Sequence, residues 1–219
     1  MNSDSIRLEL CRYAELVVRN RLVVGPGGNI SARLGDKMYL SPSGYALAEI
    51  KPEEWVEVDI PSGAIADNQL RPSSEVLMHL WAYRESADIQ AIVHTHPPNC
   101  IAFTLVATEL PIMFPDQAAL VGQTGFVPYV LPTTDRLATA VCAKVKAAST
   151  LLLGNHGLVA TGRNLREAYY RTEVVEESAR IYLTASAIRE PKVLTAEEVA
   201  EVASLESEAY RIELLQKMK

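Results

Sequence analysis

The 219-residue sequence has no apolar run of the roughly 18–20 residues that a membrane span requires. Its N-terminus also lacks the basic and apolar segments of a signal peptide. Cysteine is scarce, with three residues and no CxxC spacing, which excludes a disulfide framework; the thiols are Cys11, Cys100 and Cys142. We expect these thiols to be reduced and buried, in a cytoplasmic protein with no membrane association.

Basic residues are outnumbered by acidic ones, and the formal net charge is -6. Proteins that bind nucleic acids carry a basic surface, so this balance argues against a nucleic-acid partner. It does not exclude a small anionic substrate, because backbone amides bind phosphate without any net positive charge.

Hydrophobic residues make up 48% of the chain, enough for one large domain over residues 1–219, and no repeat or linker divides it. Apolar residues at helical spacing predict helices at about 5–22, after 73–75, at 99–106, after 134, at 164–188 and after 195. Apolar and alternating runs predict strands at 38–40, 55–59, 91–96, 126–131, 150–153 and 157–160. Residues 110–116 are expected to form a loop. Short turns join several strands, which predicts an α/β domain with a central, mostly antiparallel or mixed sheet.

Histidine is also scarce, and two of the four residues stand two positions apart at the end of an apolar run. Because side chains alternate along a strand, His94 and His96 are expected on the same face. Two imidazoles held on a rigid strand end form half of a zinc site. The alternative is that both are ordinary polar residues where the strand leaves the core.

A third histidine, His156, lies in a tight Gly-Asn-His-Gly turn between two apolar strands, where it is a candidate third ligand. The alternative is a histidine that only bonds a backbone carbonyl there. His79 is expected on a helix surface instead. Three histidines leave one open position on zinc. Glu75, at a predicted helix start, can fill that position and act as a general base, or it can simply favour the helix dipole.

Three loops rich in serine and glycine offer unhindered N–H groups and hydroxyls, which bind phosphate well. The residues concerned are Gly28 and Asn29 in the first loop, Ser43 and Gly44 in the second, and Ser73 and Ser74 in the third. Each loop alone is weak evidence, because glycine mostly marks turns. Together with the histidine pair, they predict a phosphate pocket beside a metal.

Five motifs, taken in order, resemble those of the class II aldolase/adducin family: Gly-Gly-Asn-Ile-Ser at 27–31, Ser-Pro-Ser-Gly at 41–44, Pro-Ser-Ser-Glu at 72–75, His-Thr-His at 94–96 and Asn-His-Gly at 155–157. The resemblance runs over nearly the whole chain. It implies a three-layer α/β/α sandwich around a nine-stranded, mostly antiparallel sheet. It also implies a homotetramer with active sites at the subunit interfaces.

The same resemblance assigns roles to individual residues. It implies that His94, His96 and His156 are zinc ligands and that Glu75 is both a resting-state ligand and the catalytic acid/base. Gly28 with Asn29, Ser43 with Gly44, and Ser73 with Ser74 would form the phosphate pocket. Tyr210 would reach into a neighbouring subunit's site; the alternative is an ordinary aromatic of an amphipathic helix.

One departure from the family pattern concerns the proton donor. The family's aldolase places a tyrosine in the loop after the histidine pair, whereas this chain has Met-Phe-Pro-Asp-Gln at 113–117. Asp116 can take that role, or it can be a loop residue that faces water.

The resemblance implies a zinc-dependent aldolase that cleaves a ketose 1-phosphate to dihydroxyacetone phosphate and an aldehyde through a metal-stabilised enediolate. No lysine is embedded in an apolar strand, which disfavours the Schiff-base route. Mn²⁺, Co²⁺ or Fe²⁺ can replace zinc, since several first-row ions accept imidazole. The alternatives are decarboxylation, epimerisation or dehydration of a sugar phosphate, and a non-catalytic, adducin-like interaction module.

Overall fold

A computed structural model describes residues 2–66 and 69–217. The strands are β1 (Asn29–Leu34), β2 (Lys37–Leu40), β3 (Val56–Asp59), β4 (Ala91–Thr95), β5 (Gly125–Val127), β6 (Thr150–Leu153) and β7 (Gly157–Gly162). The helices are α1 (Ser3–Arg19), α2 (Val76–Glu85), α3 (Pro98–Thr104), α4 (Pro115–Leu120), α5 (Asp135–Cys142), α6 (Leu165–Ser186), α7 (Ala196–Ser204) and α8 (Glu206–Lys217). Two short 3-10 turns, η1 (Leu47–Glu49) and η2 (Pro52–Glu54), precede β3.

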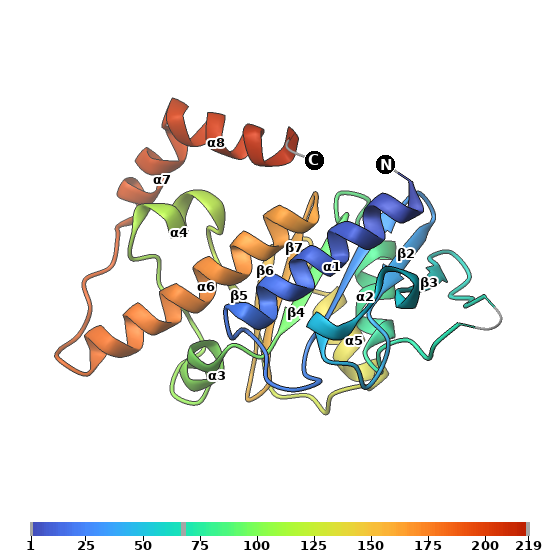
Figure 1. Ribbon diagram of the computed structural model, residues 1–219. Helices are drawn as coiled ribbons and strands as arrows, with labels where there is room; N and C mark the ends of the chain where they lie inside the picture. Colours follow the sequence, from blue (N-terminus) through green and yellow to red (C-terminus); the bar gives the residue numbers. More distant parts are fainter. Residues whose placement is uncertain (1, 67–68, 218–219) are drawn as a thin grey trace.

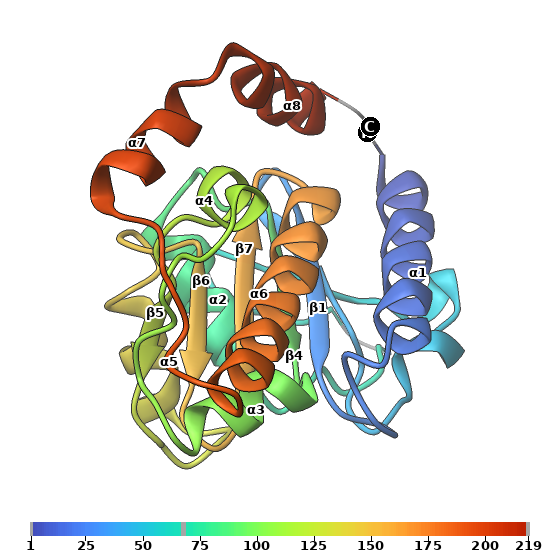
Figure 2. The ribbon, with the colours of Figure 1, turned by 90° about the vertical axis from the view of Figure 1, so that its left-hand side faces the viewer.

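The strands form one mixed sheet in the order β3-β2-β1-β4-β7-β6-β5. All neighbouring strands pair antiparallel except β5 and β6, which are parallel. Helices α2 and α5 cover one face, and α1, α3 and α6 cover the other (Figures 1 and 2). The predicted three-layer α/β/α sandwich with a mostly antiparallel sheet is confirmed.

The two faces of the sheet bury different apolar side chains, because side chains alternate along each strand. In β4, Ile92 packs in the cluster beneath α2 and α5, whereas Ala91 and Val93 pack beneath α1 and the start of α6. The same alternation carries His94, two residues after Ile92, to the α2 side. Any site built on His94 therefore forms where the sheet meets the start of α2.

Three predicted helix starts are confirmed, since Thr134, Asn164 and Thr195 each accept a backbone N–H bond with their side chain. The sequence also suggests Ser73 or Ser74 as the N-cap of α2, and this prediction is wrong. Ser73 and Ser74 precede the helix, and Glu75 itself occupies the N-cap position. The N–H of Ser73 is bonded to the carbonyl of Ser41 instead, which holds this turn against the sheet and outside the helix.

Several boundaries differ from the sequence-based expectation. The sheet has seven strands over the described residues and not nine. At one place where a further strand pair would form, Pro42 and Pro72 make only an isolated bridge, because proline lacks the N–H needed to extend a ladder. The expected loop at 110–116 is also wrong at its end, because Pro115 starts α4 and Asp116 lies in the first turn of that helix.

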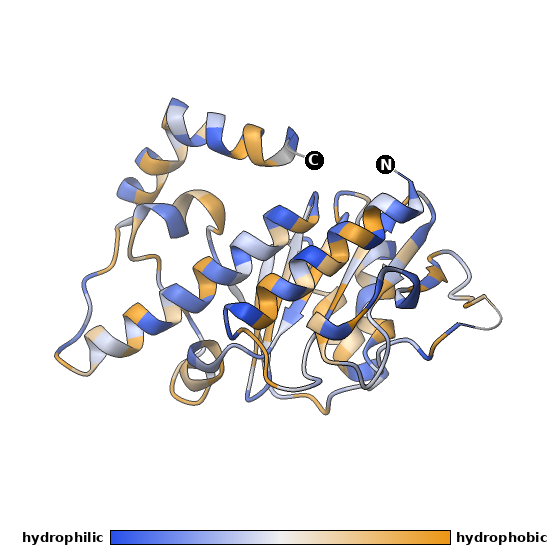
Figure 3. Ribbon diagram, in the orientation of Figure 1, coloured by the Kyte–Doolittle hydropathy of each residue, from blue (hydrophilic) through white to orange (hydrophobic). Residues whose placement is uncertain are grey.

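Helices α7 and α8 lie outside the three layers and reach back over the edge of the sheet that carries α4 (Figure 2). Hydrophobic residues recur among hydrophilic ones along α8 (Figure 3), and Tyr210 is 64% exposed. Within 2–66 and 69–217, no helix combines the length and the apolar character that a bilayer crossing needs.

The cysteines are free thiols, as predicted. Only Cys100 is fully buried, and the expectation of buried thiols is wrong for Cys11 and Cys142, which are partly buried.

Candidate metal centre

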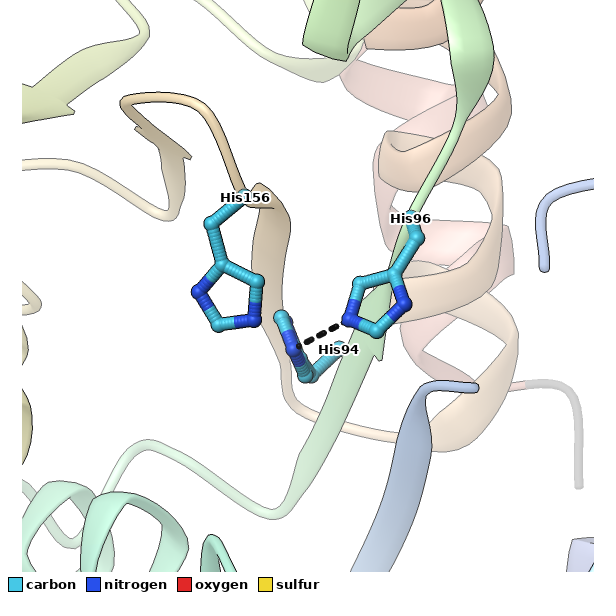
Figure 4. Close-up of side chains that lie close together, drawn as sticks. All are labelled: His94, His96 and His156. Carbon is cyan, nitrogen blue, oxygen red and sulfur yellow. Dashed lines mark hydrogen bonds between the residues drawn. The ribbon is translucent and has the colours of Figure 1, made fainter. Parts of the chain in front are cut away.

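Three imidazoles converge at the edge of the sheet where β4 ends and β7 begins (Figure 4). One potential ligand atom of each of His94, His96 and His156 lies within 4.8 Å of the others. The ring centroids of His94 are 4.9 Å from those of both partners, and the other two rings are 5.2 Å apart. The three histidines that stand out in the sequence therefore lie together in the fold.

Local backbone structure explains this convergence. Pro97 and Pro98 end β4 directly after the histidine pair, and Pro98 opens α3. Between β6 and β7, Asn155 adopts a left-handed conformation with φ 56°, which makes the turn tight enough to project the next side chain, His156, back over the sheet edge. Gly157 then follows where a side chain has no room, because an added Cβ would lie 2.2 Å from the carbonyl oxygen of Thr95.

Glu75 brings a carboxylate into the same cluster. Its Oε2 lies 3.0 Å from Nε2 of His94, and its Oε1 lies 3.6 Å from Nε2 of His156. The Nδ2 group of Asn29 donates a hydrogen bond of 2.9 Å to Oε2. Glu75 is only 7% exposed, so this carboxylate is held among the imidazoles and not in solvent.

Burial and charge together set the protonation of the cluster. Burial opposes the charged forms of both Glu75 and His94, but each stabilises the other; the pKa of Glu75 is lowered and that of His94 is raised. The charge of Glu75 also raises the pKa of the other two rings, but it does not outweigh their burial. Burial, with the charge of His94 nearby, lowers the pKa of His96 to about 3 and that of His156 to about 4. At neutral pH the rings of His96 and His156 are therefore neutral, the form in which imidazole binds a metal.

The residues present fit a divalent metal ion. Nδ1 of His94 donates to the carbonyl of Leu158 at 3.0 Å, which leaves Nε2 as the ligand atom, 3.1 Å from Nε2 of His96. Oε1 of Glu75 is buried without a hydrogen-bond partner, as is Nδ1 of His156. Three imidazole nitrogens and a carboxylate form a donor set that suits zinc and related first-row ions.

The predicted phosphate loops lie against this centre. An added Cβ on Gly28, whose φ is +72°, would meet the carbonyl oxygen of His94 at 2.8 Å, and Asn29 pairs with His94 across β1 and β4. The other two loops are joined to each other, since the N–H of Ser43 donates to the carbonyl of Arg71 and that of Ser73 to Ser41. The hydroxyls of Ser43 and Ser74, and the open backbone of Gly44, remain at the surface of this junction.

The structure does not bring Asp116 and Tyr210 to the histidines of the same chain. Asp116 is bonded to Arg211 of α8 at 3.0 Å, and the carbonyl of Leu215 in α8 accepts from Asn164, which follows β7. His156 precedes β7, so these two candidates lie at the opposite edge of the sheet, with α4 and α8 (Figure 1).

The expectation of a surface role for His79 is wrong. Its side chain is fully buried, and it bonds Asn29 and Ser31. His79 and Tyr83, on the inward face of α2, both bond Ser31 of β1, and His79 follows Glu75 by four residues. The four-residue spacing from Glu75 and the two-residue spacing of Asn29 and Ser31 are sequence signals of this contact, but they indicate it only once α2 is known to cover β1.

Comparison with known proteins agrees with the motifs. A family model described as the Class II Aldolase and Adducin N-terminal domain matches residues 8–183. L-fuculose phosphate aldolase from Methanocaldococcus jannaschii is 32% identical over 80% of this chain and 93% of its own length. 5-deoxy-D-ribulose 1-phosphate aldolase from Bacillus thuringiensis serovar kurstaki is 35% identical over 90% of this chain and 93% of its own. A solved structure of L-fuculose 1-phosphate aldolase superposes with a TM-score of 0.86, at 33% identity, and covers 93% of this chain and 96% of that one.

The chain therefore belongs to the class II aldolase and adducin family. The relatives named above are aldolases, and this chain matches them over nearly their whole length. The predicted class of enzyme, an aldolase among the carbon–carbon lyases, is therefore confirmed.

Proposed function

We propose that this chain is a zinc-dependent aldolase that cleaves a ketose 1-phosphate, L-fuculose 1-phosphate or a close analogue, to dihydroxyacetone phosphate and an aldehyde. The observation that carries the proposal is the buried carboxylate of Glu75, which lies 3.0 Å from His94 and 3.6 Å from His156 beside the cluster of three imidazoles. A non-catalytic, adducin-like module has no need for a buried charge in contact with a potential ligand. We expect such a module to bind no stoichiometric zinc.

His94, His96 and His156 would hold the ion, with Glu75 as a further ligand while no substrate is bound. A bound divalent ion would supply Lewis-acid polarisation of the substrate's oxygens. The serine and glycine loops would bind the phosphate and so fix which carbon faces Glu75. In condensation the ionised Glu75 would remove a proton from the carbon that forms the new bond, and in cleavage its protonated form would return a proton to the same carbon.

Cleavage also releases the proton of the hydroxyl that becomes the aldehyde oxygen, so a second group has to accept that proton and to return it in condensation. Asp116 and Tyr210 are the candidates, and both belong to the α4–α8 edge of the chain, joined there through Arg211. A second copy that docks this edge against the metal centre would supply both at once. This arrangement supports active sites between subunits, and the family resemblance implies that the oligomer is a homotetramer.

The test is a panel of sugar phosphates with separate detection of dihydroxyacetone phosphate, aldehyde and carbon dioxide. The panel includes L-fuculose 1-phosphate and 5-deoxy-D-ribulose 1-phosphate, the substrates in the names of the relatives. Release of dihydroxyacetone phosphate that depends on added zinc supports the proposal. Carbon dioxide release, epimerisation or dehydration without cleavage would replace it with another reaction of the family.

The metal assignment is tested separately with His94→Ala. This variant should lose both stoichiometric zinc and turnover, because the ring at the centre of the cluster is removed. Full zinc content and rate in the variant would refute the site.

The inter-subunit site is tested by mixing two inactive variants. His94→Ala lacks the metal, and Tyr210→Phe lacks one proton-exchanging group, so hybrid oligomers should regain activity at sites built from the intact half of each. No recovery after subunit exchange, with exchange verified by native mass spectrometry, would contradict the site between subunits.

The cytoplasmic location stays a prediction.

A further inference from the structure

A continuous chain of hydrogen bonds leads from the metal centre into the core beneath α2. It passes from Glu75 to Asn29 (2.9 Å), His79 (2.5 Å), Ser31 (2.7 Å) and Tyr83 (2.8 Å). All five side chains are buried, with exposures from 0% to 7%. We refer to these five residues as the Glu75–Tyr83 relay.

Chemistry permits only one direction for this relay. The ionised carboxylate of Glu75 can only accept, so the amide of Asn29 turns its Nδ2–H group toward it and its Oδ1 toward His79. Oδ1 can only accept, so Nε2 of His79 carries a hydrogen. Burial lowers the pKa of His79 to about 3, so its ring is neutral and Nδ1 must accept from the hydroxyl of Ser31. That hydroxyl in turn accepts from Tyr83.

We propose that His79 is a positioning residue for the metal centre: through its Nε2–H bond it fixes the orientation of the Asn29 amide, and thereby the carboxylate of Glu75. The two ends of an amide have nearly the same shape, so packing alone does not select between them. A flipped Asn29 would turn an oxygen toward the carboxylate, and it would turn an N–H group toward the N–H of His79. The relay thus holds Oε2 of Glu75 and leaves Oε1 facing His156.

Ser31, which accepts from Tyr83, fixes the tautomer of His79. Without a donor at Nδ1, the neutral ring is free to carry its hydrogen on that nitrogen, and Nε2 would then have no hydrogen to give Asn29. The inference deepens the proposed function, because it concerns how the proposed ligand and acid/base Glu75 is held. The effect of such supporting residues on metal affinity is typically 10- to 100-fold.

The test compares two substitutions of similar polarity. His79→Gln places an N–H group where Nε2 stands, so it keeps the bond to Asn29. His79→Asn places its polar atoms near Nδ1, so it keeps the contact with Ser31 and loses that to Asn29. Zinc dissociation constants are measured by competition with a chromophoric chelator, and the visible spectrum of the cobalt-loaded protein reports ligand geometry.

We expect His79→Asn to bind zinc at least about 10-fold more weakly and to alter the cobalt spectrum. His79→Gln should stay within about threefold of the parent protein. A role in packing alone would lower the stability of both variants and affect their metal binding equally. Equal zinc affinities and cobalt spectra in the two variants would therefore refute the positioning role.

A milder substitution serves if His79→Asn does not fold. Ser31→Ala removes the donor to Nδ1, and it should weaken zinc binding in the same direction. Its matched control is Ser178→Ala, another fully buried serine, whose hydroxyl donates to Val174 on α6 away from the site. Equal zinc affinity in Ser31→Ala and the control would refute the relay.

A measurement without metal or substrate separates this inference from the proposed function. The ¹⁵N shifts of the His79 ring in the metal-free protein distinguish its tautomers, and we expect hydrogen on Nε2 only. Hydrogen on Nδ1 would refute the relay whatever the enzyme's substrate. A protein that binds zinc and has this tautomer but cleaves no sugar phosphate would instead refute the proposed reaction.

Discussion

Replacing Gly157 by alanine should damage the metal centre through the backbone alone. Gly157 is the first residue of β7 and follows the ligand His156. A Cβ built there would lie 2.2 Å from the carbonyl oxygen of Thr95 and 3.0 Å from Cδ2 of His96. Thr95 stands between the other two ligands, so the clash presses the third ligand's strand away from the strand that carries the pair.

The size of the displacement follows from the contact distances. Real Cβ atoms almost never approach another heavy atom closer than 3.0 Å, so β7 and β4 must separate there by at least 3.0 − 2.2 = 0.8 Å. The carbonyl belongs to the backbone, so no side-chain rotation relieves the contact. Overpacking of this kind costs about 1–3 kcal/mol of stability. A shift approaching 1 Å exceeds the roughly 0.5 Å tolerance of a metal site, and we expect zinc affinity to fall by about 10- to 100-fold.

The assay pairs zinc affinity, from chelator competition, with unfolding in urea. Gly162→Ala is the matched control, because Gly162 ends the same strand and its added Cβ would lie 2.6 Å from the backbone nitrogen of Ala168. Both variants should lose stability, but only Gly157→Ala should lose zinc affinity. A Gly157→Ala protein that binds zinc as tightly as the parent protein would refute the claim that glycine sets the ligand geometry here.

Three further predictions concern charge. Because the pKa of His79 is lowered from 6.5 to about 3, the unfolded state binds a proton below pH 6.5 that the folded state does not. Stability is therefore lost as the pH falls, by about 2 kcal/mol for this group between pH 7 and 5. In urea unfolding of the metal-free proteins, His79→Gln should lack this part of the stability loss. Equal pH dependence of the stability of the variant and of the parent protein would contradict the prediction. Glu75→Gln should lower kcat on the order of 100-fold while the three histidines still bind zinc, although more weakly; retention of a tenth of the parent kcat would contradict an acid/base role. Arg211→Ala removes the ion pair with Asp116, and it should lower kcat without changing zinc affinity. The control is Arg180→Ala, which removes an exposed ion pair with Glu177 and should change neither quantity. A loss of zinc affinity in Arg211→Ala would contradict this role of Arg211.

The parts of the site that could be predicted from sequence are those fixed by local geometry. The two-residue spacing of His94 and His96 requires only that they lie on a strand, where side chains alternate. His156 required only a turn between two strands that both lie in the core. The pairing of β7 with β4 then brings the turn that carries His156 beside the strand end that carries the other two histidines.

The role of His79 could not be predicted as easily, because it depends on which element covers the inward face of α2. A lone polar residue on a helix is usually exposed. Only the packing of α2 on β1 shows that His79 is buried and bonds Ser31 and Asn29. The expectation of nine strands was wrong for a similar reason. Whether a short extended segment pairs over one residue or over four depends on its neighbour, and here proline faces proline.

The length of β7 limits what a single chain can do. Its six residues, at roughly 3.3 Å each, separate the His156 end from the Asn164 end by about 20 Å. Asp116 and Tyr210 belong to helices tied to the far end through Arg211 and Leu215. No side chain spans that distance, so these two residues can act at a metal centre only if it belongs to another copy. Proton exchange at the aldehyde oxygen by either residue thus requires an oligomer, and dilution below the dissociation constant of the oligomer should abolish turnover while zinc remains bound.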